Sequence, residues 1–239
     1  MDIGRIYFDP PNSSPTKARI IPLETHVGNV QQLVETWSHD RAYRVLADCN
    51  LEMTRQKLIE AARRHDEAKP VTFKVTADSH KYGYSFAGHR FRVQCADLYT
   101  DLLIKRHHDF SVDEIAECQA RLHREVGDVY ARNFPLDLYT LEMCDQVAAE
   151  AESYAMEGKS DERAFMELHS RKREDGSIEV DPFPFGQSPL VLTVNFYEYE
   201  IPSDILTGEK PTEKLTIALK AWMPDKAYEQ KKKVTLCQP

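Results

Sequence analysis

Hydrophobic residues at helical spacing run through the chain from about residue 22 to about residue 157. Val30 and Leu33 belong to one such stripe, and Leu138 and Leu141 belong to a later one. Apolar residues three and four positions apart share one face of a helix. We therefore expect a bundle of amphipathic helices over this part of the chain.

Proline and capping residues predict where these helices begin and end. The prolines between residues 10 and 22 predict an irregular N-terminal segment. Pro70 is expected to stop the second helix, and another helix is expected to run from about Phe91 into a doublet of histidines. The tetrapeptide 111–114 has the sequence of a capping box, so a new helix is expected directly after the doublet.

The period of the pattern changes after the helical part. Residues 161–189 are charged and then rich in proline and glycine, which predicts a connecting stretch. Hydrophobic and polar residues alternate over 190–197 and 215–221, the period of half-buried strands, and 234–236 could add a third. The prediction is a mainly α protein, with a helical domain at 1–160 and a linker and small antiparallel β appendage at 161–239.

The composition agrees with a folded protein that has no membrane contact. The chain has 239 residues, of which 41% are hydrophobic and 29% charged, as in ordinary globular domains. No segment approaches the roughly 20 apolar residues that cross a bilayer, and the N-terminus lacks a signal-peptide pattern. The five cysteines are scattered without any CxxC. We therefore expect a reducing, cytoplasmic location and no disulfide framework.

Histidine and aspartate interrupt the apolar stripes. His26 lies on the stripe of Val30, the dipeptide His65-Asp66 closes the second helix, and Asp145 lies on the stripe of Leu141. A buried histidine alone is most often a core imidazole with a hydrogen-bond partner, and a buried aspartate is often a salt bridge or cap. Buried carboxylates normally need a cation, and so many such positions together predict a metal site. The candidate ligands are His26, His65, Asp66, His89, His107, His108 and Asp145.

The His-Asp dipeptide is a weak signal by itself, because His39-Asp40 and His108-Asp109 repeat it. Only His65-Asp66 closes an apolar helix and is followed by a lysine, Lys69, and a proline. The remaining histidines lack such a setting and are interpreted as surface or structural residues: His80, His123 and His169. Of these, His80 is the one expected to lie nearest to substrate.

In chain order, the candidate residues resemble the H, HDxxK, H, HH and D pattern of the HD superfamily of metal-dependent phosphohydrolases. They are His26, His65-Asp66-Glu67-Ala68-Lys69, Gly88-His89, His107-His108 and Asp145. The histidine doublet is most similar to the HD nuclease of type I CRISPR interference, and the match covers roughly the first two-thirds of the chain. The resemblance implies an HD-domain helical bundle with two metal ions. One ion would be held by His26, His65, Asp66 and Asp145, and the other by Asp66, His89, His107 and His108.

Two divalent ions about 3.5 to 4 Å apart can activate water for attack on a phosphate ester. Asp66 would bridge the ions, and Lys69 would orient the water or stabilise charge on the phosphoryl oxygens. A histidine-rich ligand set favours Mn, Ni, Co or Fe over Mg. This chemistry predicts a divalent-metal-dependent phosphodiesterase with Asp66 and Lys69 as catalytic residues. The resemblance implies that it is a nuclease that hydrolyses single-stranded DNA in CRISPR interference.

The formal net charge of -8 argues against binding nucleic acid by bulk electrostatics. Any contact with DNA is therefore expected to be local. Basic residues flank the candidate ligands and predict a rim that faces phosphate, although each pair alone could be a solvated helix face. They are Arg63, Arg64, Lys69, Arg90, Arg92, Lys105 and Arg106.

The chain has no GxxxxGK[ST] loop, so it carries no recognisable ATP-driven motor. In the family that it resembles, the HD domain is often fused to a helicase. The resemblance therefore implies a stand-alone subunit that works beside a separate helicase subunit and the CRISPR effector complex. Two alternatives stay open, an HD-type nucleotide or small-molecule phosphohydrolase and a non-catalytic scaffold.

Overall fold

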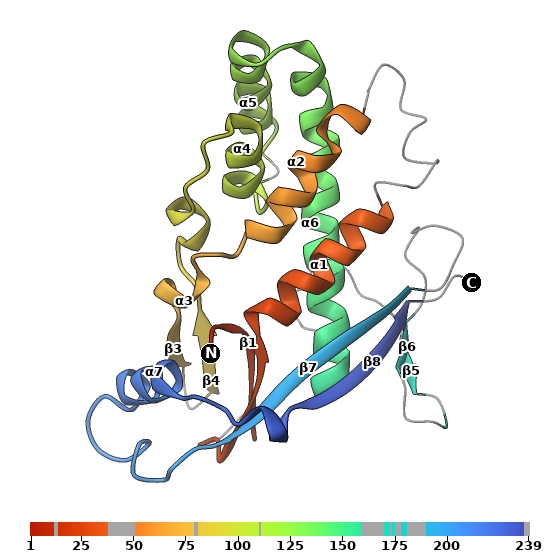
Figure 1. Cartoon of the computed structure of the whole chain (residues 1–239). Coiled ribbons are helices and arrows are strands. Elements are labelled where there is room, and N and C mark those ends of the chain that lie inside the picture. Colours follow the sequence, from red (N-terminus) through yellow and green to blue (C-terminus); the bar gives the residue numbers. More distant parts are fainter. Residues whose placement is uncertain are drawn as a thin grey trace.

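Figure 1 shows the protein as a computed structural model, in which helices stand on a twisted sheet. The secondary structure of the described residues is mainly helical, with small sheets that include the C-terminal strands. The structure describes residues 1–11, 14–37, 51–78, 81–109, 111–158, 170–172, 174, 178–180 and 190–236.

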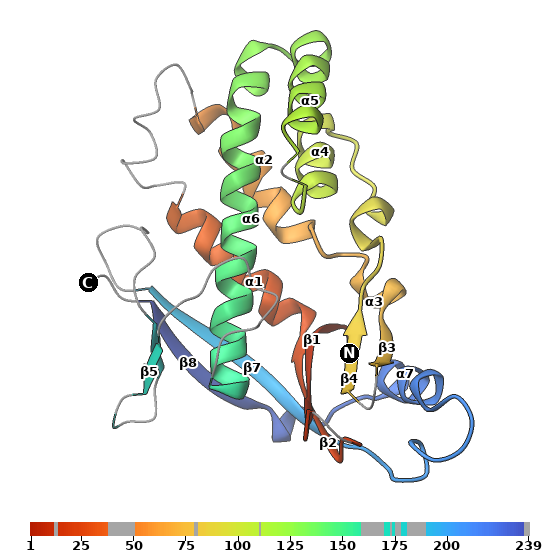
Figure 2. The ribbon, with the colours of Figure 1, turned by 180° about the vertical axis from the view of Figure 1, so that it is seen from behind.

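A long helix, α6 (Asp128–Glu157), is the axis of the helical part. From behind, it runs from the top of the helices down to strands β7 (Leu190–Glu200) and β8 (Gln230–Leu236) (Figure 2). Helices α1 (Leu23–Trp37), α2 (Leu51–Arg64) and α5 (Val112–Glu125) pack against it. The predicted stripes are confirmed, because the following residues are fully buried: Val30, Leu33, Leu138, Leu141 and Ala148. No described helix combines the length and the apolar character that a bilayer crossing requires.

Pro135 lies inside α6 and has no N–H to donate to the carbonyl of Ala131, one turn earlier. The side chain of Gln119, on α5, supplies the missing donor. Its Nε2 atom donates to the Ala131 oxygen at 2.9 Å. Helix α5 thus satisfies a carbonyl of α6 at the point where the proline interrupts the backbone ladder.

The prediction that Pro70 stops a helix is wrong. Helix α2 already ends at Arg64, and Pro70 lies in the first turn of a short helix, α3 (Lys69–Thr72). Proline is tolerated there because the first N–H groups of a helix have no partner within it. By contrast, α5 begins at Val112, as predicted, although the Ser111 side chain makes no capping hydrogen bond.

The helix expected from about Phe91 begins later. Helix α4 spans Leu98–Arg106, and the carboxylate of Asp97 caps it by accepting from the backbone N–H of Thr100 at 2.9 Å. Residues His89–Arg92 form a separate 3-10 helix, η2. An N-cap aspartate stabilises a helix start, so Asp97 explains the boundary that periodicity alone misplaced.

The prediction of an irregular N-terminus is wrong. Strands β1 (Ile3–Asp9) and β2 (Lys17–Pro22) form an antiparallel pair there. Pro10, Pro11 and Pro15 lie in the connection, and Pro22 is the last residue of β2. Proline is excluded from strand interiors but not from their ends. These prolines therefore delimit the strands instead of abolishing them.

The strand expected at 215–221 is a helix, α7 (Pro211–Ala221). Leu215 and Leu219 are buried, whereas Ile217 is 68% exposed. Burial at every fourth residue is typical of a helix, and the alternation of hydrophobic residues concealed it. Pro211 lies in the first turn, where helices accept proline.

The strands predicted near residues 190 and 234 are confirmed as β7 (Leu190–Glu200) and β8 (Gln230–Leu236). They belong to a six-stranded sheet of order β1-β2-β7-β8-β6-β5, with β6 at Ile178–Val180 and β5 at Ser170–Lys172. All neighbours are antiparallel except β6 and β8. The sheet is therefore larger than the predicted appendage, and it joins strands from both sides of the division expected at residue 160.

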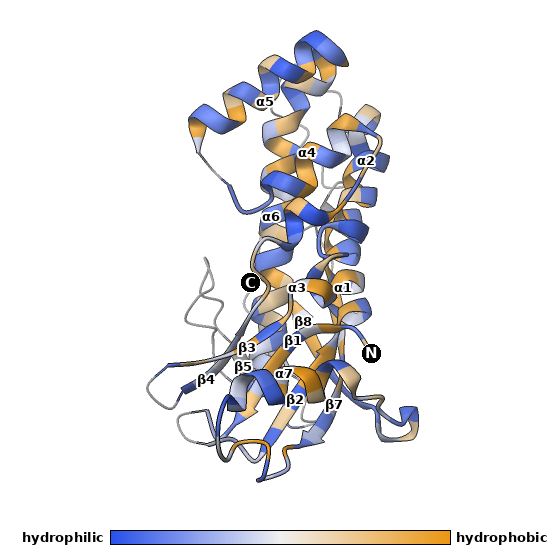
Figure 3. Ribbon diagram, turned by 90° about the vertical axis from the view of Figure 1, so that its left-hand side faces the viewer, coloured by the Kyte–Doolittle hydropathy of each residue, from blue (hydrophilic) through white to orange (hydrophobic). Residues whose placement is uncertain are grey.

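The sheet and helices enclose two hydrophobic cores. Tyr7 and Ile21 face the main core with α1 and α6, whereas Ile6 and Phe8 face a second core. The second core also includes α7 and residues next to or within β3 (Lys74–Asp78), whose hairpin partner is β4 (Lys81–Ser85). Figure 3 shows hydrophobic residues gathered where α1, α6, β1 and β8 meet. The N-terminal strands are thus covered on both faces.

Candidate metal centre

The candidate ligands come from the ends of several elements and from the middle of α6. His26 lies in the first turn of α1, His65-Asp66 directly follows α2, and His107-His108 directly follows α4. His89 opens η2 after Gly88, whose backbone is left-handed with a φ of 71°. Helix ends place side chains beside unpaired backbone groups, and the carbonyls in the last turns of α2 and α4 hold the rings of His65 and His107.

One group of four buried ligands combines His26, His65, Asp66 and Asp145. One ligand atom from each lies within 4.8 Å of all the others. The Nε2 atom of His26 lies 3.0 Å from Oδ1 of Asp145 and 3.3 Å from Oδ2 of Asp66. The Nε2 atom of His65 lies 3.7 Å and 3.3 Å from the same two oxygens. This group could hold one metal ion.

A second group combines His89, His107 and His108, whose ligand atoms also lie within 4.8 Å of one another. The two groups meet at Asp66. Its Oδ1 atom lies 2.9 Å from Nε2 of His89, while its Oδ2 atom faces the first group. Asp66 therefore has the place that a bridging carboxylate between two ions would need.

Backbone hydrogen bonds orient three of these rings. His65, His89 and His107 each have Nδ1 beside a carbonyl oxygen three residues earlier, at 2.7, 2.8 and 2.6 Å. These contacts assign the proton to Nδ1 and leave Nε2 as a lone-pair donor. A metal-ligating histidine is usually fixed in this way through its other ring nitrogen.

Buried polar atoms at this place make no well-formed hydrogen bond among the described residues, although the Lys69 ammonium forms an ion pair with one oxygen of Asp66. They are the Nε2 atoms of His26, His65, His89 and His107 and both carboxylate oxygens of Asp66. Buried polar groups are normally hydrogen-bonded, and each exception needs an explanation. Divalent cations would satisfy all of these atoms at once, so the donor set fits metal ions.

Charges within the cluster oppose the effect of burial on the pKa of His65 and of Asp66, but reinforce it at His107. Burial would lower the pKa of His65, but Asp66 and Asp145 raise it to about 9. Burial would raise the pKa of Asp66, but the His65 and Lys69 cations hold it well below its usual range. Burial and the charge of His108 keep the pKa of His107 well below its ordinary value. Cations and protons would therefore compete for these ligands.

Lys69 lies against the shared carboxylate. Its ammonium group pairs with Oδ2 of Asp66 and lies 5.1 Å from the centroid of the Phe86 ring. Burial would lower the pKa of Lys69, but Asp66 and Asp145 raise it. The lysine is therefore a fixed cation at the edge of the cluster.

Two glutamates of α6 that were not predicted as site residues also contact the cluster. Glu142 lies 3.2 Å from Nδ1 of His108 and forms a third possible ligand group with His108 and Asp145. Glu152 lies 3.0 Å from Nδ1 of His26. Their spacing from Asp145 could have indicated them in the sequence. Glu142 lies three residues before Asp145 and Glu152 seven residues after it, so both share its face of the helix.

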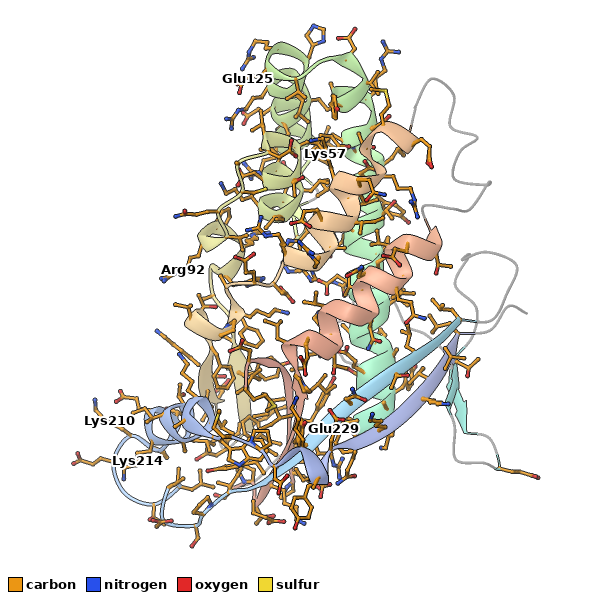
Figure 4. All side chains as sticks on the ribbon, in the orientation of Figure 1. Lys57, Arg92, Glu125, Lys210, Lys214 and Glu229 are labelled. Atoms are coloured by element: carbon orange, nitrogen blue, oxygen red, sulfur yellow. The ribbon has the colours of Figure 1, made fainter. Side chains whose placement is uncertain are left out.

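Most of the predicted basic rim is engaged in ion pairs with acidic side chains. Arg90 and Arg106 both pair with Asp109, and Lys105 pairs with Asp101. Arg63 and Arg64 pair with nearby glutamates of the same segment. Arg92 differs, because it is exposed and no ion pair of it occurs within the described ranges. Figure 4 shows its side chain directed away from the protein.

The other histidines lie away from the cluster or outside the described residues. His123 is exposed and pairs with Asp128, which confirms its interpretation as a surface residue. His39-Asp40, His80 and His169 lie outside the described residues.

No protein-family model, no curated protein and no solved structure matches this chain.

Proposed function

We propose that this protein is an HD-type, divalent-metal-dependent phosphodiesterase that hydrolyses single-stranded DNA. The observation that carries the proposal is the cluster of buried Nε2 and carboxylate atoms around Asp66, which converge on one another without making well-formed hydrogen bonds among the described residues. The order of the ligands along the chain, with HDxxK and a histidine doublet, adds the resemblance to HD nucleases.

In this proposal, His26, His65, Asp66 and Asp145 hold one ion, and Asp66 with the histidines of the second group holds the other. Divalent ions held there would supply Lewis acidity toward phosphoryl oxygens and would lower the pKa of a nearby water. Imidazole ligands favour Mn, Ni, Co or Fe, whereas Mg prefers oxygen. The neutral rings also leave more of the positive charge of the ions uncompensated than carboxylates would.

Lys69 acts on the substrate in this proposal. The ammonium group is already fixed beside Asp66, so it needs little reorganisation to face charge that develops on a phosphoryl oxygen. A preorganised donor of this kind typically contributes about 10²- to 10³-fold to turnover. No protein nucleophile is required, because water supplies the attacking oxygen.

The preference for a single strand is supported by the surface next to His89. Phe91 is 55% exposed, and the Arg90 guanidinium lies 4.7 Å from its ring centroid. Arg92, the next residue in the chain, extends into solvent (Figure 4). Unpaired bases can stack on an exposed aromatic ring while an arginine contacts phosphate. Base pairs in a duplex cannot present their faces in this way.

From the same resemblance we propose that the protein acts in CRISPR interference. A separate helicase subunit and the effector complex would then deliver the displaced single strand, because this chain has no ATP-binding loop. The chain itself would supply only the hydrolytic step.

The test is a nuclease assay with purified protein. With Mn or Ni and without ATP, linear and circular single-stranded DNA should be degraded, duplex DNA should stay largely intact, and a chelator should stop the reaction. If single-stranded DNA survives with every divalent ion tried, the nuclease proposal is wrong.

One observation favours the alternative of a nucleotide or small-molecule phosphohydrolase. Among the candidate ligands, His108 is exposed, whereas all the others are buried. A deep site suits a small phosphate ester better than a polymer that must pass through. Phosphate release from nucleotides that is faster than cleavage of single-stranded DNA would select this function.

A further inference from the structure

Glu152 is a buried carboxylate behind the proposed metal centre. Its side chain has no solvent exposure, and its two oxygens lie 3.2 and 3.0 Å from Nδ1 of His26. Asn29 donates from Nδ2 to one of these oxygens at 3.4 Å, and Nε of Arg5 lies 3.8 Å from the other. A buried carboxylate needs a cation or strong donors, and these neighbours supply both.

His26 differs from the other buried histidines in what holds its ring. His65, His89 and His107 bond through Nδ1 to backbone carbonyls near the ends of their segments. Carbonyls in the first turn of a helix are engaged in the helix ladder, and free carbonyls occur only in the last turn. His26 lies in the first turn of α1, so its Nδ1 needs an acceptor from elsewhere, and α6 supplies Glu152.

We propose that Glu152 is a positioning residue for the metal ion that His26, His65, Asp66 and Asp145 would hold. Its carboxylate fixes the proton of His26 on Nδ1, aims Nε2 at Asp66 and Asp145, and makes that nitrogen a stronger ligand. This inference rests on the proposed metal centre but adds a residue that is not itself a ligand. Removing such an outer partner typically weakens metal binding about 10- to 100-fold.

The experiment measures metal affinity, independently of any cleavage. Co²⁺ or Mn²⁺ is titrated into wild type, Glu152→Gln, His26→Ala and the variant that carries both substitutions, in competition with a chelator. Gln keeps the volume and an acceptor oxygen but removes the charge. Glu150→Gln is the matched control, because Glu150 is also fully buried on α6. Circular dichroism and thermal unfolding establish that each variant is folded.

We expect Glu152→Gln to bind one of the two ions about 10- to 100-fold more weakly and the other as in wild type. The double variant with His26→Ala should be no weaker than His26→Ala alone, because Glu152 acts through His26. Glu150→Gln should bind both ions normally.

The outcomes separate this inference from the proposed function. If wild type binds two ions and folded Glu152→Gln binds both with unchanged affinity, the positioning role is wrong and the metal centre stands. Equal weakening of both ions, or added losses in the double variant, would also overturn the role. If wild type binds no divalent ion, the metal centre itself is wrong, and the inference falls with it.

Discussion

The Oδ1 atom of Asp66 lies 2.9 Å from Nε2 of His89, while its Oδ2 atom lies 3.3 Å from Nε2 of His26 and of His65. The two oxygens of one carboxylate therefore face two different groups of histidines. In a two-ion site, such a carboxylate serves both ions, whereas each histidine serves one. Substitutions at these positions should therefore differ in how many ions are lost.

The first prediction concerns this difference. Asp66→Ala should lose both ions and reduce cleavage to background, because it removes the shared ligand. His65→Ala and His108→Ala should each lose one ion, with cleavage nearly as low. Metal content by mass spectrometry and a single-strand nuclease assay measure the two effects.

His123→Ala is the control for the first prediction, because this histidine is exposed and pairs only with Asp128 among the described residues. It should keep metal content and activity near wild type. An active, metal-replete Asp66→Ala variant would contradict the assignment of the bridging ligand.

The second prediction is that Lys69→Ala differs in kind from the ligand variants. Its metal content should stay near wild type, because an ammonium group binds no cation. Turnover should fall about 10²- to 10³-fold if the lysine stabilises phosphoryl charge. Comparing kcat with metal stoichiometry on the same sample tests this. If metal content fell in proportion to activity, Lys69 would instead act only by holding the carboxylate of Asp66 in position for metal binding.

His26, His65-Asp66 and Asp145 could be located from the sequence because they lie on or next to helical stripes, whereas His89 was selected by the resemblance to the HD pattern. Leu138 and Leu141 predict the buried face of α6, and Asp145 follows on that face. The dipeptide His65-Asp66 ends the stripe of α2 in the same way. A polar residue where periodicity requires burial is visible in sequence alone, so the structure brings together residues that the pattern had already selected.

Glu142 and Glu152 share that buried face and were still not predicted as parts of the site. Their spacing places them on the buried face of α6 but does not reveal which side chains pack against that face. Their partners, His108 and His26, come from distant segments of the chain. The N-terminal strands were missed because the prolines that delimit them were interpreted as breaking regular structure, and because part of their pairing is distant in sequence. Strand β2 pairs with β7, far along the chain, and no local pattern reports such a pairing.

The third prediction concerns Gln119, the donor to Ala131 beneath Pro135. Gln119→Ala should lower the free energy of unfolding by about 1 kcal/mol, because it leaves this carbonyl of α6 without its donor. Urea denaturation measures the effect. Gln31→Ala removes a side-chain bond to Glu35 within α1 and should cost about 0.5 kcal/mol or less. Equal losses in both variants would mean that the proline needs no compensating donor.

The fourth prediction concerns the pH dependence of stability at Asp137, which lies on α6 away from the metal cluster. Its side chain is buried, and Tyr99 donates to its Oδ2 atom at 2.7 Å. Burial raises the pKa of this carboxyl from 3.8 to about 6, against the hydrogen bonds from Thr54 and Tyr99. Between about pH 4 and pH 6 the folded protein therefore holds a proton that the unfolded chain has released.

Stability falls with rising pH wherever the folded state binds more protons than the unfolded state. Ionised Asp137 should therefore destabilise the protein above pH 6, by roughly 3 kcal/mol at about 1.4 kcal/mol per pKa unit. Asp137→Asn keeps an acceptor for Tyr99 and removes the charge, so it should be more stable than wild type at pH 7, with the difference shrinking toward pH 4. Urea unfolding of both proteins from pH 4 to 8 measures this difference, with the exposed Asp204→Asn as control. A difference that does not change with pH would mean that the pKa of Asp137 is the same in the folded and the unfolded state.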